Sequence, residues 1–232
     1  MTTAEVPQSQ PTALGRRTVE TTAGFSGLLF LLLILLQNVL KQATNPANNA
    51  SAADLIRFAH DQAWSVNLLV VTYIIGFPAL FLFAAGLAAQ AERFNPAAQI
   101  WGRLGRASVN VIAVLFGFVN IVQIVMVAAR DALAGDPALT TTLWTLHNAV
   151  FTLNLVAVGG ALLGLSRAAA LAGLIPRPFG LACAGGALLL GVAAAPAVAE
   201  IHGSMLLGLG LIGFICWMVF LAWSSARLLS GK

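Results

Sequence analysis

The chain has 232 residues, of which 59% are hydrophobic and only 9% are charged, with a formal net charge of +4. A soluble globular domain is about half apolar and about a quarter charged, so this composition excludes that class and indicates that lipid surrounds most of the chain. No basic run with interleaved aromatic residues accompanies the positive charge, so nucleic acid is not an expected partner, whereas membrane lipids are.

Long apolar runs predict an all-α, polytopic integral membrane bundle of about six transmembrane helices. About 20 apolar residues cross the hydrocarbon core as a helix, because backbone groups in lipid must bond within their own segment. The runs are continuous rather than short and alternating, which argues against a transmembrane β-barrel. The predicted spans are residues 24–40, 64–90, 108–129, 143–166, 178–198 and 203–225.

The polar residues 1–23 precede the first predicted span and contain Pro7 and Pro11. Such a segment cannot bury enough apolar surface to fold, so we expect a disordered tail. No small-residue cleavage pattern follows a short apolar region, so we expect an uncleaved first span and no signal peptide. Residues 24–228 are then a single six-helix transmembrane domain.

Residues 51–62 precede the second span and have the pattern of a short amphipathic helix. Ser51 is a suitable N-cap, and Asp54 would place an acid in the first turn. The apolar positions of this segment recur at helical spacing: Leu55, Ile56, Phe58 and Ala59. We therefore expect a helix that lies on the outer leaflet and leads into the second span.

Glycine is frequent in spans four to six. Gly160 and Gly164 form a G-x-x-x-G motif in the fourth span. Further glycines give spans five and six small faces: Gly185, Gly186, Gly191, Gly208, Gly210 and Gly213. Small residues allow helix backbones to approach closely in lipid, so we expect close packing of spans four to six. A seam with a second copy or with partner membrane subunits is the alternative.

Basic residues in short loops predict the orientation, since Lys and Arg are retained on the cytoplasmic side. With both termini inside, nine of the twelve basic residues are cytoplasmic, and only Lys41, Arg57 and Arg130 face outward. We therefore predict a multi-pass protein of a bacterial plasma membrane with cytoplasmic N and C termini. All three histidines then lie on the outer side: His60, His147 and His202.

Polar residues in the outer halves of the spans predict a cavity that opens outward, lined by spans two, three, four and six. An imidazole inside a span usually faces the bundle interior, so His147 is expected in this cavity. The full set of candidate ligand-binding residues is His147, His202, Glu200, Asn154, Asn120, Gln123 and Asn67. The alternative for the amides is hydrogen bonding between helices, and for Glu200 and His202 it is capping of a tight reversal between spans five and six.

A metal or haem site is a second hypothesis for the outer side. Its candidate ligands are His60, Asp61, His147, Glu200 and His202, and a divalent metal or a haem would be the cofactor. None of their spacings is a zinc motif, and in a regular helix Glu200 and His202 would point about 200° apart. For His60 and Asp61 the alternative is a solvated surface. Catalytic residues cannot be assigned from the sequence.

Three stretches resemble a known family: "AGFSGLLFLLLILL" at the first span, "DLIRFAHDQ" before the second, and "LIPRPFGLACAGGALLL" at the fifth. The chain resembles the bacterial multi-pass membrane proteins grouped as domain of unknown function 4386. The resemblance implies a bundle of six or seven spans and no established activity.

Three functions fit these observations. The first is binding or movement of a small amphipathic ligand, such as a lipid or a quinone, in the outward-facing cavity. An enzyme that uses His147 or His202 as a base on a lipid substrate is a variant of it. The second is an accessory or structural subunit of a membrane complex. The third is a redox subunit that binds haem or a metal.

Overall fold

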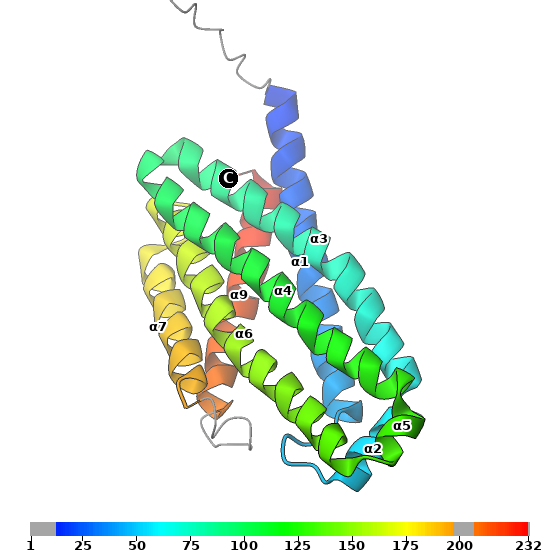
Figure 1. Ribbon diagram of the computed structural model, residues 1–232. Helices are drawn as coiled ribbons and strands as arrows, with labels where there is room; N and C mark the ends of the chain where they lie inside the picture. Colours follow the sequence, from blue (N-terminus) through cyan, green and yellow to red (C-terminus); the bar gives the residue numbers. More distant parts are fainter. Residues whose placement is uncertain (1–12, 197–206, 232) are drawn as a thin grey trace, which may run out of the picture.

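The computed structural model describes residues 13–196 and 207–231, and this part of the chain is helical apart from short turns (Figure 1). The predicted all-α fold is confirmed, since the described residues contain no strand. The elements are α1 (Ala13–Thr44), α2 (Ala52–Asp61), α3 (Ala63–Phe94), the 3-10 helix η1 (Pro96–Ala98), α4 (Gln99–Ala128), α5 (Arg130–Ala134), α6 (Pro137–Leu171), α7 (Arg177–Ala194) and α9 (Leu207–Ser230).

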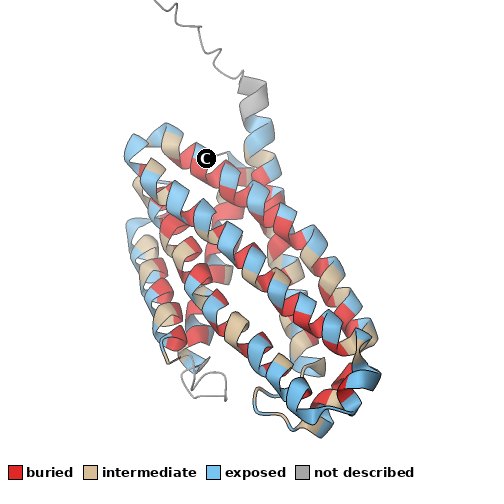
Figure 2. Cartoon of the chain, in the orientation of Figure 1, coloured by how far each residue is buried: buried red, intermediate tan, exposed pale blue. Residues whose placement is uncertain are grey.

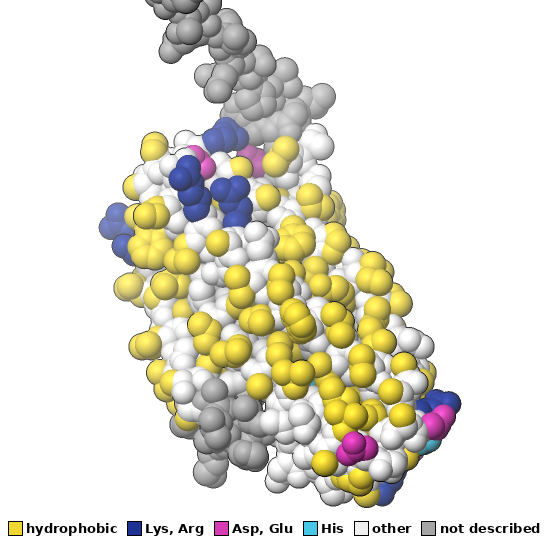
Figure 3. All heavy atoms as spheres, in the orientation of Figure 1, with side chains coloured by type: hydrophobic (Ala, Val, Ile, Leu, Met, Phe, Trp, Pro, Cys, Tyr) yellow, Lys and Arg dark blue, Asp and Glu magenta, His cyan; other side chains and the backbone are white. Residues whose placement is uncertain are grey.

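Within the described ranges, six helices are long and apolar enough to cross a membrane, namely α1, α3, α4, α6, α7 and α9. The surface agrees with this assignment, because on the face that Figure 3 shows, apolar side chains cover the middle and charged side chains gather at the two ends. We call the end that carries α2 and α5 the α2 end, and the end where α1 begins and α9 finishes the terminal end (Figure 1).

The spanning helices form a closed ring in chain order. Each packs against the next, in the pairs α1 with α3, α3 with α4, α4 with α6, α6 with α7 and α7 with α9, and α9 returns to α1. Buried positions lie on the faces that the helices turn toward one another, and exposed positions face outward (Figure 2). The largest fully buried side chains include Trp217, Phe83 and Phe220, which lie in one continuous apolar core.

Two helices begin well before the predicted spans. α1 begins at Ala13, so residues 13–23 are helical and the prediction of a disordered tail is wrong there; residues 1–12 lie outside the described part. Tertiary contacts explain the difference, because Ala23 is buried and Glu20 pairs with Arg93 of α3 at 3.8 Å. Similarly, α4 begins at Gln99 rather than 108. Hydropathy predicts only the apolar part of a helix that lies in the hydrocarbon core. Each of these two helices continues for further turns of more polar residues outside that core.

Helix α2 covers the segment predicted to be amphipathic. The Oγ atom of Ser51 accepts a hydrogen bond from the backbone N–H of Asp54 at 3.2 Å, which is the expected N-cap. The environment of its apolar face differs from the prediction, however. That face packs into a second cluster formed with α3, α4, α5 and α6 rather than against lipid: Leu55, Phe58, Ala59, Val66, Val122, Met126, Leu133 and Trp144. α2 therefore caps one end of the bundle.

The glycines pack closely, but not all against the predicted partners. A Cβ on Gly164 would lie 2.4 Å from the backbone nitrogen of Gly105, so the G-x-x-x-G motif faces α4 rather than α7 or α9. The glycines of α7 and α9 do bring these helices together, since a Cβ on Gly213 would lie 2.5 Å from the carbonyl oxygen of Gly186. A Cβ on Gly185 would meet no atom of the described chain within 4 Å, so Gly185 faces away from this contact.

Candidate ligand-binding site

A cavity of about 400 Å³ lies between α1, α3, α4, α6 and α9, in the half of the bundle toward the α2 end. The volume falls within the usual range for small-molecule sites, near its lower limit. Most of its described lining is apolar and comes from all five helices: Phe30, Ile34, Phe77, Leu80, Ile112, Phe116, Phe151, Leu155, Val158, Gly208, Gly210, Leu211, Phe214 and Trp217. These walls suit the hydrocarbon part of a ligand.

The polar part of the lining comes mainly from the last turns of α1. Its members are Gln37, Asn38, Lys41 and Gln42, and α6 adds Asn154. Positions three and four apart share one side of a helix, so the α1 residues form a single polar stripe along the cavity. The cavity is therefore amphipathic, with apolar walls and a group of amides around one amine.

Lys41 is the cation of this group. Its Nζ atom is buried and has no hydrogen-bond partner in the part of the chain that the structure describes. The ammonium lies 4.3 Å from the centre of the Phe116 ring and 5.2 Å from that of Phe151. Attraction to the faces of these rings offsets part of the cost of burying a charge. The three ion pairs among the described residues all involve arginine, and none includes Lys41.

Two amides supply buried acceptors in the same cavity lining. Gln37 is held in place because its Nε2 donates to Oγ1 of Thr72 at 2.7 Å and to the carbonyl oxygen of Leu69 at 3.3 Å. Its Oε1 is buried and unpartnered, as is Oδ1 of Asn154, within the described residues. Each unpaired buried polar atom carries a desolvation cost, which a ligand or water with hydrogen-bond donors would remove.

His147 is buried as expected but is not among the residues that line the cavity. Its ring stacks on Trp144 with 4.3 Å between ring centres and an angle of 6° between ring planes. Nδ1 lies 3.1 Å from Oδ1 of Asn148, whereas Nε2 is buried without a partner in the described part. Asn148 in turn donates to the carbonyl oxygen of Asn48 at 3.1 Å. His147 lies one turn before Phe151 on α6, and the Phe151 ring contacts Lys41, so the two sites are neighbours.

Asn120 and Gln123 are both buried on α4, and neither lines the cavity. Nδ2 of Asn120 donates to the carbonyl oxygen of Phe116 in the preceding turn at 3.0 Å. The side-chain amide of Gln123 has no partner for either polar atom among the described residues. Asn67 differs from the prediction because it is exposed on the outside of α3, so the structure does not bring it to the cavity.

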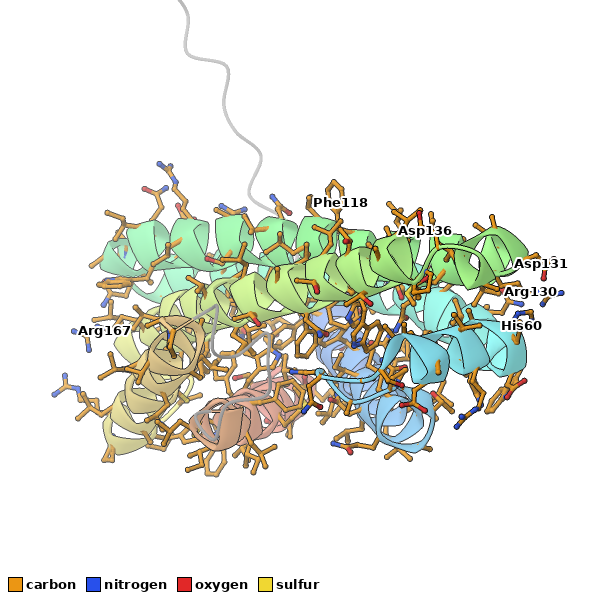
Figure 4. The ribbon with its side chains drawn as sticks, turned by 60° about the horizontal axis from the view of Figure 1, so that its bottom comes forward. His60, Phe118, Arg130, Asp131, Asp136 and Arg167 are labelled. Carbon is orange, nitrogen blue, oxygen red and sulfur yellow. The ribbon has the colours of Figure 1, made fainter. Side chains whose placement is uncertain are left out.

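The predicted metal ligands do not come together in the described part of the chain. His60 is exposed near the end of α2 (Figure 4), and so is the next residue, Asp61, whereas His147 is buried and stacks on Trp144. In that part, no group of three or more His, Cys, Asp or Glu side chains is arranged to hold a metal ion. Glu200 and His202 lie outside the described residues.

The residues that sequence reasoning missed are those of α1. Gln37, Asn38, Lys41 and Gln42 follow an uninterrupted apolar run, and Lys41 looks like an ordinary basic residue at the end of a span. Their helical spacing could have identified one polar face. The missing information was that α1 closes the ring against α9, which buries Gln37 and the Nζ atom of Lys41 at the cavity.

No protein-family model, no curated protein and no solved structure matches the chain. The family indicated by the three short stretches therefore stays a prediction.

Proposed function

We propose that the protein binds a small amphipathic ligand in the cavity between α1, α3, α4, α6 and α9, and presents or moves that ligand within the membrane. The observation that carries the proposal is the division of the lining into apolar walls and one polar group at Lys41. A ligand with a hydrocarbon part and a polar head would satisfy both. Amides and an amine bind by charge and hydrogen bonds, so binding or transport accounts for this lining directly.

We further propose that the α2 end faces outward in a bacterial plasma membrane and that both termini are cytoplasmic. Exposed arginines at the terminal end support this orientation, because cytoplasmic ends of membrane proteins are rich in Lys and Arg. They include Arg93, Arg103, Arg106, Arg167 and Arg177, which lie near the ends of α3, α4, α6 and α7. At the α2 end, Arg57 and Arg130 are accompanied by four exposed carboxylates, namely Asp54, Asp61, Asp131 and Asp136. Arg130, Asp131 and Asp136 are labelled in Figure 4. The cavity would then lie in the outer half of the bilayer.

Native mass spectrometry of the protein in maltoside micelles tests the binding proposal. Dodecanoate, dodecanol and a short-chain quinone are titrated separately, and we expect at least one of them to form a one-to-one complex. Val158→Phe places a ring in the cavity wall, so it should abolish that complex. Val156→Phe is the matched control, since Val156 is 53% exposed on the outside of the same helix, and it should bind like the wild type.

Equal binding by the Val158→Phe and Val156→Phe proteins would place the ligand elsewhere and refute the proposal. A failure of all three amphiphiles to bind the wild-type protein would have the same consequence. Melting temperatures of both variants without ligand show whether each is folded, because overpacking in a core typically costs about 1–3 kcal/mol.

A further inference from the structure

Lys41 is unusual among the basic residues of this chain because its charge is buried. Basic residues at the two ends of the bundle include Arg57, whose side chain is 70% exposed and pairs with Asp54. The Nζ atom of Lys41 instead has essentially no accessible surface and no partner in the described part of the chain. A protonated amine has three donors and no acceptor, so all three hydrogen bonds are left unmade.

Burying an unpaired charge is costly, and such groups persist in proteins mainly where they serve a site. The Phe116 and Phe151 rings stabilise the ammonium through their faces, but an aromatic ring accepts no conventional hydrogen bond and carries no net charge. The described residues therefore compensate the charge and the donor groups of Lys41 only in part. An anion in the cavity would supply both the countercharge and the missing acceptors.

We infer that the cavity selects an anionic ligand, a single-chain amphiphile with a carboxylate head group that binds to Lys41. The inference rests on the proposed function, because it names the class of ligand that the cavity accepts. The carboxylate accepts charge-assisted hydrogen bonds from Nζ of Lys41, and the hydrocarbon chain lies along the apolar walls between Phe30, Phe77 and Trp217.

The shape and chemistry of the lining favour this class over others. A cavity of about 400 Å³ suits one hydrocarbon chain with a compact head rather than a lipid with two chains. The ammonium of lysine is a compact charge, unlike the planar guanidinium of arginine, which binds two oxygens at once. A small carboxylate can therefore pair with Lys41 without a fixed two-point geometry. The unpaired oxygens of Gln37 and Asn154 accept hydrogen bonds from a water or hydroxyl beside the carboxylate.

The head-group preference of the wild-type protein is the first test. Dodecanoate, dodecanol and dodecyltrimethylammonium share one chain length and differ in charge, and acetate supplies the carboxylate without a chain. By native mass spectrometry at neutral pH we expect dodecanoate to bind at least about tenfold more tightly than dodecanol. The cationic amphiphile and acetate should not bind measurably. Equal affinity for dodecanoate and dodecanol would overturn the inference and leave the proposed function standing.

Substitution of the lysine is the second test. Lys41→Gln should weaken dodecanoate binding by about 10- to 100-fold and leave dodecanol binding nearly unchanged. Lys41→Met tests the same loss of charge with a side chain that fills similar space. Arg57→Gln removes a positive charge from the exposed surface of α2 and is the matched control, with wild-type affinity for dodecanoate expected.

The melting temperature without ligand separates a binding role from a structural one. If the lysine is held ready for an anion, Lys41→Met should melt at or above the wild-type temperature, because an unpaired buried charge has been removed. A large fall in melting temperature with an unchanged preference for dodecanoate would show a packing role and overturn the inference. Failure of every amphiphile to bind the wild type would instead refute the proposed function itself.

Discussion

The two halves of the bundle are built from the same helices but are packed differently. Toward the terminal end, a Cβ on Gly24, Gly27, Gly86, Gly105 or Gly164 would come within 3 Å of a neighbouring helix, so α1, α3, α4, α6 and α9 are in direct contact there. Toward the α2 end, large aromatic side chains separate these helices and surround the cavity. The close helix contacts at the terminal end thus fix the helix positions. At these positions the helices are far enough apart toward the α2 end to leave the cavity.

Buried polar groups occur in both halves, and toward the α2 end some of them line the cavity. The terminal end contains the long-range hydrogen bond from Asn95 to the carbonyl oxygen of Leu171 at 3.0 Å and the bond from Arg227 to that of Leu174 at 3.3 Å, both of which join segments distant in sequence. Toward the α2 end, bonds of the same kind run from Trp144 to the carbonyl oxygen of Ala47 at 3.0 Å and from Gln37 to Oγ1 of Thr72 at 2.7 Å. In the cavity lining of this half, however, the Nζ atom of Lys41 is buried without a partner in the described chain. Hydrogen bonds thus join the helices at both ends, and the unpartnered polar atoms that line the cavity lie toward the α2 end.

The largest effect is expected from Gly164→Ala at the terminal end. The added methyl group would lie 2.4 Å from the backbone nitrogen of Gly105 and 2.8 Å from the carbonyl oxygen of Trp101, and backbone atoms cannot move aside locally. We expect a loss of about 3 kcal/mol or more in unfolding free energy, measured by thermal melting in detergent and by denaturant titration.

Gly185→Ala is the control for this substitution. Gly185 also lies inside a spanning helix, but a Cβ there meets nothing within 4 Å, so the change should be neutral or should stabilise by about 0.5–1 kcal/mol. A Gly164→Ala protein as stable as the Gly185→Ala protein would show that close glycine contact does not hold the terminal end together.

The sequence predicted the architecture because lipid imposes a simple pattern on a spanning helix. The apolar runs of α3 and α6, for example, are long enough to be recognised without any tertiary information. The same pattern could not locate the first residue of α1, because Glu20 and Ala23 are held by contacts with α3 rather than by lipid. Hydropathy carries no information on contacts between segments distant in the sequence, so it does not predict helix ends that depend on them.

The site was predicted less completely, and for a related reason. The sequence showed that polar residues gather near one end, and the structure places Asn154 in the cavity lining. It could not show which residues face the same space, because that depends on how the ring closes. Asn67 is exposed whereas the Nζ atom of Lys41 is buried, although both are polar residues near the same end of the bundle.

A medium effect is expected from Gln123→Met, which tests the polar groups of the cavity half. The Gln123 side chain is fully buried, and both of its polar atoms lack partners in the described structure. An apolar side chain of similar length removes this desolvation cost, so unfolding free energy should rise by about 1–3 kcal/mol. A lower melting temperature would instead show that the amide is paired through bound water and supports the fold. Val122→Met, a substitution at the adjacent buried position, controls for the volume of methionine.

The smallest effect is expected from His147→Phe, which tests whether the imidazole belongs to the site. A phenyl ring preserves the stacking on Trp144, and the loss is confined to the contact between Nδ1 and Asn148. Since His147 does not line the cavity, amphiphile affinity should stay within about twofold of wild type, with a stability change of about 1 kcal/mol or less. The measurement is the same mass-spectrometric titration, with Trp144→Phe as a second probe of the stacked pair. Because His147 lies one turn before Phe151, whose ring contacts Lys41, a loss of dodecanoate binding comparable to that of Lys41→Gln would extend the site to the imidazole and shift the boundary between the two halves toward α2.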